Sequence, residues 1–239
     1  MARIALFDPC YMNTLRPGDA ANAVHVLEAL GDEVTLLDGR CCGQPAFNSG
    51  FRNEARSVGR EALKAGRPFE AVVVTSGSCT SMVRHYLPML YDGPRRLAAG
   101  QIAERFVDFP TYVGTHPKLD SVIFQLEGTV AVHDACHTRR ELGSSHHVLA
   151  LLERVEGLEV RRLAHEEECC GFGGSFSVKL PEVSVAMMTS KLDDVALSGA
   201  RVITSADYSC LAHLQAGADG IGLQMEGWSL PEVLARALE

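Results

Sequence analysis

The sequence of 239 residues contains no run of lysine or arginine, and its formal net charge of −8 argues against a general nucleic-acid surface. No apolar stretch approaches the roughly 20 residues that a bilayer-spanning helix needs. The first ten residues, MARIALFDPC, lack the long apolar region and small-residue cleavage site of a signal peptide. We therefore expect a cytoplasmic protein with no transmembrane segment and no nucleic-acid partner.

Several common cofactor motifs are also missing. The sequence contains no Cys-x-x-Cys, which is the usual spacing of structural zinc ligands, and no ferredoxin-like cysteine run. The dinucleotide-binding pattern Gly-x-Gly-x-x-Gly is not matched, and nothing resembles a flavin or phosphate site. No Ser-His-Asp arrangement suggests a hydrolase, so no catalytic residue is predicted.

Cysteine is abundant and ordered. A single cysteine, a Cys-Cys-Gly triplet and a second single cysteine occur twice along the chain. The two sets are Cys10, Cys41, Cys42 and Cys79, then Cys136, Cys169, Cys170 and Cys210. The second set follows the first by 126 residues at its first cysteine and by 131 at its last, as small loop insertions between two copies of one unit would produce. We expect two domains, residues 1–115 and 116–239.

Each half alternates short apolar runs with stretches of helical periodicity. Strands are expected at residues 3–8, 33–38, 71–76, 129–134, 158–163 and 201–205. Helices are expected at residues 19–30, 54–65, 81–91, 144–155, 182–197 and 209–216, with a last one from Pro231 capped by Ser229. This alternation predicts an α/β fold of two pseudo-symmetric tandem domains, each a small, mainly parallel sheet flanked by helices. The cysteines follow strand ends, where such sheets bind ligands, so we expect their sites near an edge shared by both domains.

Four explanations of the cysteines compete. Burial as small hydrophobes would not produce an ordered repeat, and disulfides are disfavoured in a reducing compartment. Zinc binds four thiolates, but adjacent cysteines chelate a single ion poorly. An iron–sulfur cluster offers neighbouring sulfurs separate irons. Gly43 and Gly171 can redirect the backbone, and the stretch from Cys169 to Gly174 can bring N–H groups near the sulfurs. Iron–sulfur binding is the favoured hypothesis, and a zinc-stabilised scaffold that docks partner subunits is the alternative.

The stretches CCGQPAFNSG, SGSCTSMV, HDACHTRRELG and EECCGFGGSFSVKLPEVS resemble the CCG, or cysteine-rich domain, family over nearly the whole chain. The resemblance is greatest to its lactate utilisation protein A group, and more distant to the cysteine-rich subunit of heterodisulfide reductase and the glycolate oxidase iron–sulfur subunit. It implies an electron-transfer oxidoreductase subunit that is inactive without two partner subunits, one of which carries ferredoxin-like clusters. The implied reaction of the assembly is oxidation of L-lactate to pyruvate.

The resemblance also implies a ligand set for one or two clusters per chain, with [4Fe–4S] expected. The implied ligands are Cys10, Cys41, Cys42, Cys79, Cys136, Cys169, Cys170 and Cys210. The fuller family motif ends in Cys-x-x-Cys, whereas Met82 and His213 occupy its last position here. Methionine is a poor cluster ligand and histidine an uncommon one. This departure argues against a third hypothesis, a thiol/disulfide reductase of the heterodisulfide reductase type.

Polar residues around Cys136 allow two interpretations each. His133 and His137 could donate hydrogen bonds to a cluster or carry protons, or they could be ordinary, fully hydrogen-bonded residues at a strand end. Arg139 and Arg140 could offset the negative charge of a cluster or bind a carboxylate substrate, or they could simply lie solvated at a helix start.

Overall fold

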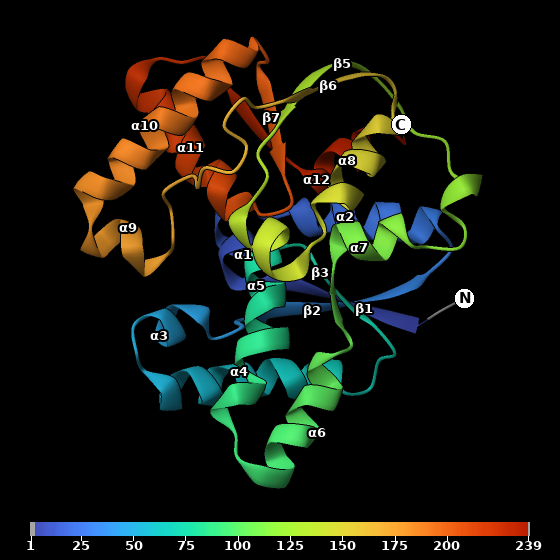
Figure 1. Ribbon diagram of the computed structural model, residues 1–239. Coiled ribbons are helices and arrows are strands. Elements are labelled where there is room, and N and C mark those ends of the chain that lie inside the picture. Colours follow the sequence, from blue (N-terminus) through green and yellow to red (C-terminus); the bar gives the residue numbers. More distant parts are fainter. Residues whose placement is uncertain (1–2, 239) are drawn as a thin grey trace.

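The computed structural model describes residues 3–238, without the side chains of residues 38–40. It contains two four-stranded sheets in which every strand pairing is parallel (Figure 1). The first sheet has the order β2-β1-β3-β4 and consists of β1 (Arg3–Pro9), β2 (Glu33–Arg40), β3 (Val72–Val74) and β4 (Phe106–Asp108). The second has the order β6-β5-β7-β8 and consists of β5 (Gln125–Val132), β6 (Glu156–Arg162), β7 (Val202–Ser205) and β8 (Glu226–Ser229). Because the two orders match strand for strand, the predicted pair of tandem α/β domains is confirmed.

Helices cover both faces of each sheet. In the first half they are α1 (Cys10–Leu15), α2 (Asp19–Ala29), α3 (Gln44–Asn48), α4 (Arg52–Gly66), α5 (Gly77–Ser81), α6 (Gly93–Ala103) and α7 (Phe109–Gly114). In the second half they are α8 (Ser145–Glu153), α9 (Ser175–Lys179), α10 (Pro181–Ser198), α11 (Tyr208–Ile221) and α12 (Leu230–Arg236). Short π-helical turns, η1 (Met82–Tyr86) and η4 (Thr138–Leu142), and 3-10 turns, η2 (Pro88–Leu90) and η3 (Leu119–Ser121), complete the chain. None of the helices in the described residues is long and apolar enough to span a membrane.

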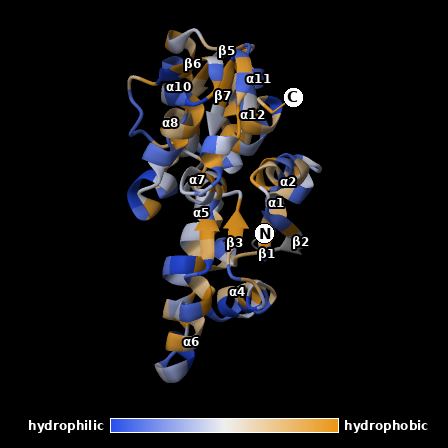
Figure 2. Ribbon diagram, turned by 90° about the vertical axis from the view of Figure 1, so that its right-hand side faces the viewer, coloured by the Kyte–Doolittle hydropathy of each residue, from blue (hydrophilic) through white to orange (hydrophobic). Residues whose placement is uncertain are grey.

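The two halves meet through a repeated helix contact. Helix α2 packs against α12, and α7 packs against α8, in the layer between the two sheets (Figures 1 and 2). Helices α2 and α8 each follow the first strand of their half, whereas α7 and α12 each follow the fourth. Each contact thus joins the helix after the first strand of one half to the helix after the fourth strand of the other, as expected for two pseudo-symmetric units.

The apolar core follows these layers. The strands show as hydrophobic ribbons between the helices in Figure 2. One buried cluster contains residues of both halves, among them Leu27 of α2, Phe109 of α7, Leu152 of α8 and Val233 of α12. Two further clusters lie on the outer faces of the sheets, under α4 and α6 in the first half and under α10 and α11 in the second. The halves thus share one central core, which fixes the geometry of any site between them.

Several boundaries differ from the sequence prediction. The helix expected at residues 81–91 begins at Gly77 and ends in π-helical and 3-10 turns, because Pro88 cannot continue an α-helix. Strands β4 and β8 were not predicted. The last helix is confirmed, with Pro231 in its first turn and the Ser229 hydroxyl accepting the Glu232 N–H at 3.1 Å. The domain division between residues 115 and 116 stays a prediction.

Candidate metal centre

All eight cysteines line one cavity of about 190 Å³ to which both halves contribute. Cys10 follows β1 directly, and Cys79 lies in α5, just after β3. Strands β1 and β3 are neighbours whose following helices, α2 and α6, pack on opposite faces of the sheet. Cys136 and Cys210 stand in the same relation to β5 and β7 of the second sheet. Such a switch point opens a crevice at the carboxyl ends of the strands, which explains why the cysteines converge there.

The four sulfurs of the first half form one hydrogen-bonded group. Hydrogen bonds with Cys10 and Cys42, aided by the Gly43 N–H at 3.4 Å, lower the pKa of Cys41 to about 2. The pKa of Cys10 is raised by its hydrogen bond with Cys41 and by burial. The Cys42 thiol lies 3.3 Å from the Cys79 sulfur, and hydrogen bonds to Cys41 and Cys79, together with burial, raise its pKa.

The second half repeats this arrangement. Hydrogen bonds with Cys136 and Cys170, again with a backbone N–H from Gly171 at 3.4 Å, lower the pKa of Cys169 to about 2. The pKa values of Cys136 and Cys170 are raised, in each case chiefly by the hydrogen bond to Cys169. In Cys210 the hydrogen bond with Cys170 lowers the pKa, but burial and the negative charges of Asp207 and Cys169 together outweigh it, and the net shift is upward. Each half therefore stabilises one thiolate among neighbouring thiols.

This pattern suits a soft, thiolate-binding metal group. Several thiolates cannot ionise side by side in a buried site without a compensating cation, so the remaining thiols stay protonated when no metal is bound. A metal ion displaces those protons and relieves the repulsion. The donor set fits an iron–sulfur cluster and also fits zinc.

Glycine is required after each cysteine pair. Gly43 has φ of +88° and Gly171 has φ of +87°, a conformation that other residues rarely adopt. A Cβ atom at Gly43 would lie 2.6 Å from the Ala55 carbonyl oxygen, and one at Gly171 would lie 2.5 Å from that of Ser184. Both glycines turn the backbone, as the sequence predicted, and the N–H groups of both lie near a sulfur, which the sequence predicted for the stretch that contains Gly171.

His133 lies beside two sulfurs of the second group, although it is not among the residues that line the cavity. It is 1% exposed, and a ring nitrogen and the sulfurs of Cys170 and Cys210 all lie within 4.8 Å of one another. Its Nδ1 atom has no hydrogen-bond partner among the described residues. Burial, with a contribution from the Lys191 charge, lowers the pKa of His133 to about 4, so the ring is neutral near pH 7. The interpretation of a fully hydrogen-bonded strand-end histidine is therefore wrong for Nδ1.

His137 lines the cavity and touches both halves. Its Nδ1 atom is 3.6 Å from the Cys136 sulfur, and its Nε2 atom is 3.4 Å from Nε2 of Gln44 in the first half. His213 and Met82 do not line the cavity. His213 lies 3.3 Å from the Ser184 hydroxyl and against the Phe172 ring, while Met82 is buried in the first outer core. The two positions where the fuller motif has cysteine thus contribute no donor to the cavity.

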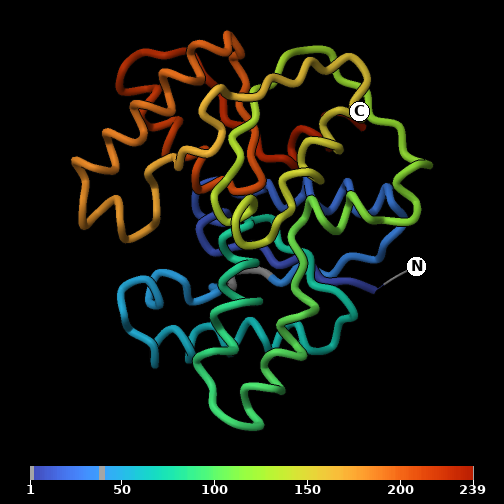
Figure 3. The backbone as a smooth tube through the Cα atoms, viewed as in Figure 1, coloured from blue at the N-terminus to red at the C-terminus, as the bar shows by residue number. Residues whose placement is uncertain are grey.

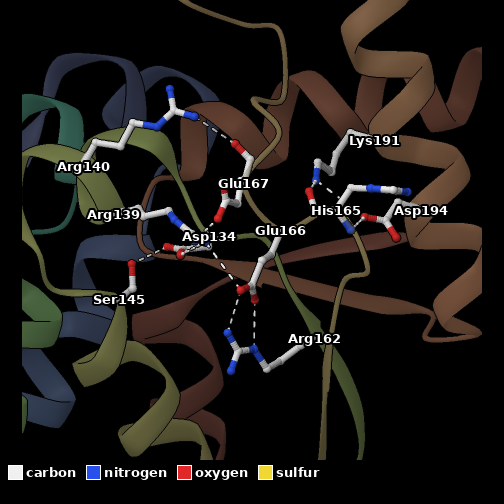
Figure 4. Close-up of polar contacts among 10 residues, drawn as sticks. All are labelled: Asp134, Arg139, Arg140, Ser145, Arg162, His165, Glu166, Glu167, Lys191 and Asp194. Atoms are coloured by element: carbon white, nitrogen blue, oxygen red, sulfur yellow. Dashed lines mark hydrogen bonds and ion pairs between the residues drawn. The ribbon is translucent and has the colours of Figure 1, made fainter.

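Arg139 and Arg140 point to carboxylates and backbone outside the cavity lining (Figure 4). Arg139 pairs with Asp134 at 3.4 Å, with Glu166 at 3.6 Å and with Glu167 at 2.7 Å. Arg140 donates a hydrogen bond to the Glu167 carbonyl at 3.2 Å. Because the Arg139 charge is already matched by these carboxylates, it has little left to offset a cluster or to bind a substrate.

Comparison with known proteins agrees with this geometry. The cysteine-rich CCG domain family matches residues 4–84 and 130–215, which contain all eight cysteines. The chain belongs to this family. It is 33% identical to lactate utilization protein A of Macrococcus caseolyticus, covering 99% of this chain and 98% of that protein. It is 35% identical to the Bacillus velezensis protein of that name (97% and 98%) and 37% identical to the Exiguobacterium one (90% and 89%).

Solved structures show only a distant likeness to this CCG chain. A putative Asp/Glu racemase from Yersinia pestis has a TM-score of 0.41 at 12% identity, covering 100% of this chain and 97% of that one. A glutamate racemase isoform from Bacillus anthracis has a TM-score of 0.35 at 13% identity, covering 98% and 79%. Such TM-scores are too low to assign a common fold or chemistry.

Asp207 joins the two CCG halves beside the sulfurs, and the sequence patterns did not indicate it. Its Oδ2 atom accepts hydrogen bonds from the Ser78 N–H at 2.8 Å and the Ser76 hydroxyl at 3.1 Å. Its Oδ1 atom accepts from the Ser209 hydroxyl at 2.6 Å and from Tyr11 at 3.2 Å. Ser76 and Asp207 each stand three residues before the last cysteine of their half, so an alignment of the two repeats would have singled them out.

A buried ion pair holds the segment that enters the second CCG cysteine pair (Figure 4). The Asp194 carboxylate accepts the backbone N–H groups of Ala164 and His165, each at 2.9 Å. Lys191, which is fully buried, donates to the His165 carbonyl and lies 3.6 Å from Asp194. Helix α10 thereby fixes the path of the chain from β6 to Cys169. Figure 3 shows this path as a continuous tube.

Proposed function

We propose that this protein is the iron–sulfur electron-transfer subunit of a multi-subunit system that oxidises L-lactate to pyruvate. The observation that carries the proposal is the meeting of eight cysteines, four from each half, in one cavity. The relatives named lactate utilization protein A match nearly the whole chain and supply the substrate. The proposed ligands are Cys10, Cys41, Cys42 and Cys79 in the first half, and Cys136, Cys169, Cys170 and Cys210 in the second. The proposed group is a [4Fe–4S] cluster, with one or two per chain.

A bound iron–sulfur cluster supplies a carrier for single electrons. The chain supplies thiolates already gathered in two groups, and the shared central core holds those groups against one cavity. The Gly43 and Gly171 N–H groups stabilise the negative charge on Cys41 and Cys169. Such hydrogen bonds to ligand sulfur also favour the reduced state of a cluster, so they tune the site toward accepting electrons.

The cavity lining supports relay of electrons rather than binding of lactate. Arginine and lysine are the side chains that most strongly favour a small carboxylate. Neither residue lines the cavity in the described part of the chain, where Asp207 is the carboxylate present. A lactate anion entering there would meet thiolates and Asp207, which repel it. We therefore assign substrate oxidation to a partner, within an assembly of this subunit and two others in the cytoplasm, one partner carrying ferredoxin-like clusters.

The relay is tested with anaerobically purified chain, alone and with its partner subunits. The isolated chain should be reduced and reoxidised reversibly by chemical reagents, and it should not be reduced by L-lactate. Addition of the partner subunits should make the reduction lactate-dependent. A chain carrying both Cys41→Ser and Cys169→Ser is the control and should show neither response. Reduction of the isolated chain by lactate would overturn the relay.

A zinc-stabilised scaffold is the second candidate, because four gathered thiols per half also satisfy zinc. Colourless anaerobic protein with stoichiometric zinc and no sulfide would establish it. A thiol/disulfide reductase is less well supported, since Met82 and His213 place no further donor in the cavity.

A further inference from the structure

The two halves differ at one buried position beside the sulfurs. Three residues before the first cysteine, the first half has Phe7 and the second has His133. Phe7 is fully buried, and its ring packs edge-on against Phe106 with the centroids 6.1 Å apart. An apolar side chain therefore satisfies this position of the repeat, and packing alone does not call for an imidazole.

The buried imidazole of His133 destabilises the fold, and its packing does not compensate for this. A buried polar atom without a hydrogen bond destabilises the fold, and the Nδ1 atom of His133 has no partner among the described residues. His133 directly follows β5, which pairs with β7, and its backbone N–H donates a hydrogen bond to the Thr204 carbonyl at 2.8 Å. This hydrogen bond fixes the backbone from which the ring projects.

Two neighbours of His133, Cys170 and Cys210, have sulfur atoms that can bind a metal. A ring nitrogen and the sulfurs of Cys170 and Cys210 all lie within 4.8 Å of one another. Donor atoms gathered this closely can turn toward one metal group, because metal–sulfur bonds are about 2.3 Å and metal–nitrogen bonds about 2.0 Å. All three residues are buried, so water does not compete with them for a metal.

We propose that His133 is an iron ligand of the second half, beside Cys170 and Cys210 and in place of Cys136 or Cys169, because a [4Fe–4S] cluster takes four protein ligands. This inference rests on the proposed iron–sulfur function. The first half then holds its metal group with thiolates alone, because Phe7 offers no donor. A neutral imidazole gives a cluster less negative charge than a thiolate does, and histidine ligation raises reduction potentials. The second half is accordingly the more oxidising of the two sites and the one that holds the electron.

Nitrogen hyperfine spectroscopy tests this ligand directly. The full chain is purified without oxygen, with ¹⁵N-labelled histidine, and reduced before its electron paramagnetic resonance is recorded. We expect the strong coupling of an iron-bound nitrogen. This coupling should be lost in His133→Phe, which reproduces the first half, and should be retained in His137→Ala, which removes the histidine next to Cys136.

A second variant reports on the potential. His133→Cys replaces nitrogen by thiolate, and we expect it to lower the reduction potential of one site while the other stays unchanged. If either variant fails to fold, the spectrum of the labelled wild-type chain decides the question. An iron–sulfur signal with only the weak coupling of a hydrogen-bonded histidine would overturn the ligand and leave the electron-transfer function standing. A chain with no iron or sulfide would overturn the proposed function and this inference with it.

Discussion

The Asp207 carboxylate accepts the backbone N–H of Ser78 at 2.8 Å, across the junction between the two CCG halves. Ser78 lies in the first turn of α5, directly before Cys79, so a residue of the second half positions a cysteine of the first. Asp207 is 2% exposed and also caps α11, which carries Cys210. One carboxylate therefore orients the helices that hold the last cysteine of each half.

Replacement of this carboxylate should weaken the junction. Asp207→Ala leaves the Ser78 N–H and the Tyr11 hydroxyl without their acceptor, and we expect it to lower the free energy of unfolding by about 3 kcal/mol. Urea unfolding of the metal-free chain measures the effect. Asp219→Ala, which removes an exposed carboxylate, should change the value by less than about 0.5 kcal/mol. Equal effects of the two substitutions would refute the role of Asp207.

Gly171 should not tolerate a side chain. In Gly171→Ala the methyl group would meet the Ser184 carbonyl oxygen at 2.5 Å in an unfavourable backbone conformation. We expect a loss of about 2 kcal/mol or more in stability and of about half the bound metal. Gly100→Ala is the matched control, because Gly100 lies inside α6 with open space around its Cα atom. It should raise stability by up to about 1 kcal/mol, and a similar loss in both variants would contradict the steric argument.

A single cysteine substitution should remove about half of the bound metal. The sulfurs hydrogen-bond within each half, so Cys42→Ser should empty the first site and leave the second, and Cys170→Ser should do the reverse. Each variant should retain about half the metal of the wild type, whereas Met89→Ser, at an exposed position, should retain all of it. Complete loss of metal from a single cysteine substitution would indicate one shared site instead of two.

In the Lys191–Asp194 pair, loss of the carboxylate should lower the stability of the fold more than loss of the ammonium group. Asp194→Ala strands a buried positive charge and two backbone N–H groups, at a cost of about 3–5 kcal/mol. Lys191→Met leaves Asp194 with its two N–H donors, so we expect a smaller loss. Thermal unfolding gives the order, with the exposed neighbour Asp193→Ala as control. A larger loss in Lys191→Met would reverse this assignment.

Much of the fold is predictable from local patterns. The β-branched runs around Val73 and Ile203 identify the central strands, because strands buried on both faces need continuous apolar sequence. The edge strands β4 and β8 have only three and four residues and carry no such pattern. The start of α5 was missed although its cap, Ser76, which accepts the Cys79 N–H, is a local signal.

The site is predictable as a set of cysteines but not in its surroundings. The repeat and the parallel sheet together predict that the sulfurs gather at strand ends, and the cavity contains all of them. The isolation of the His133 Nδ1 atom depends on what packs around it, which no spacing encodes. The same holds for Arg139, whose carboxylate partners Glu166 and Glu167 are distant in sequence.

Metal analysis tests the central proposal most directly. Iron, sulfide and zinc are measured per chain on anaerobically purified protein, together with its electron paramagnetic resonance after reduction. We expect about four or about eight irons, matched by sulfide, for one or two [4Fe–4S] clusters. Stoichiometric zinc without sulfide would contradict the electron-transfer function and leave the scaffold in its place.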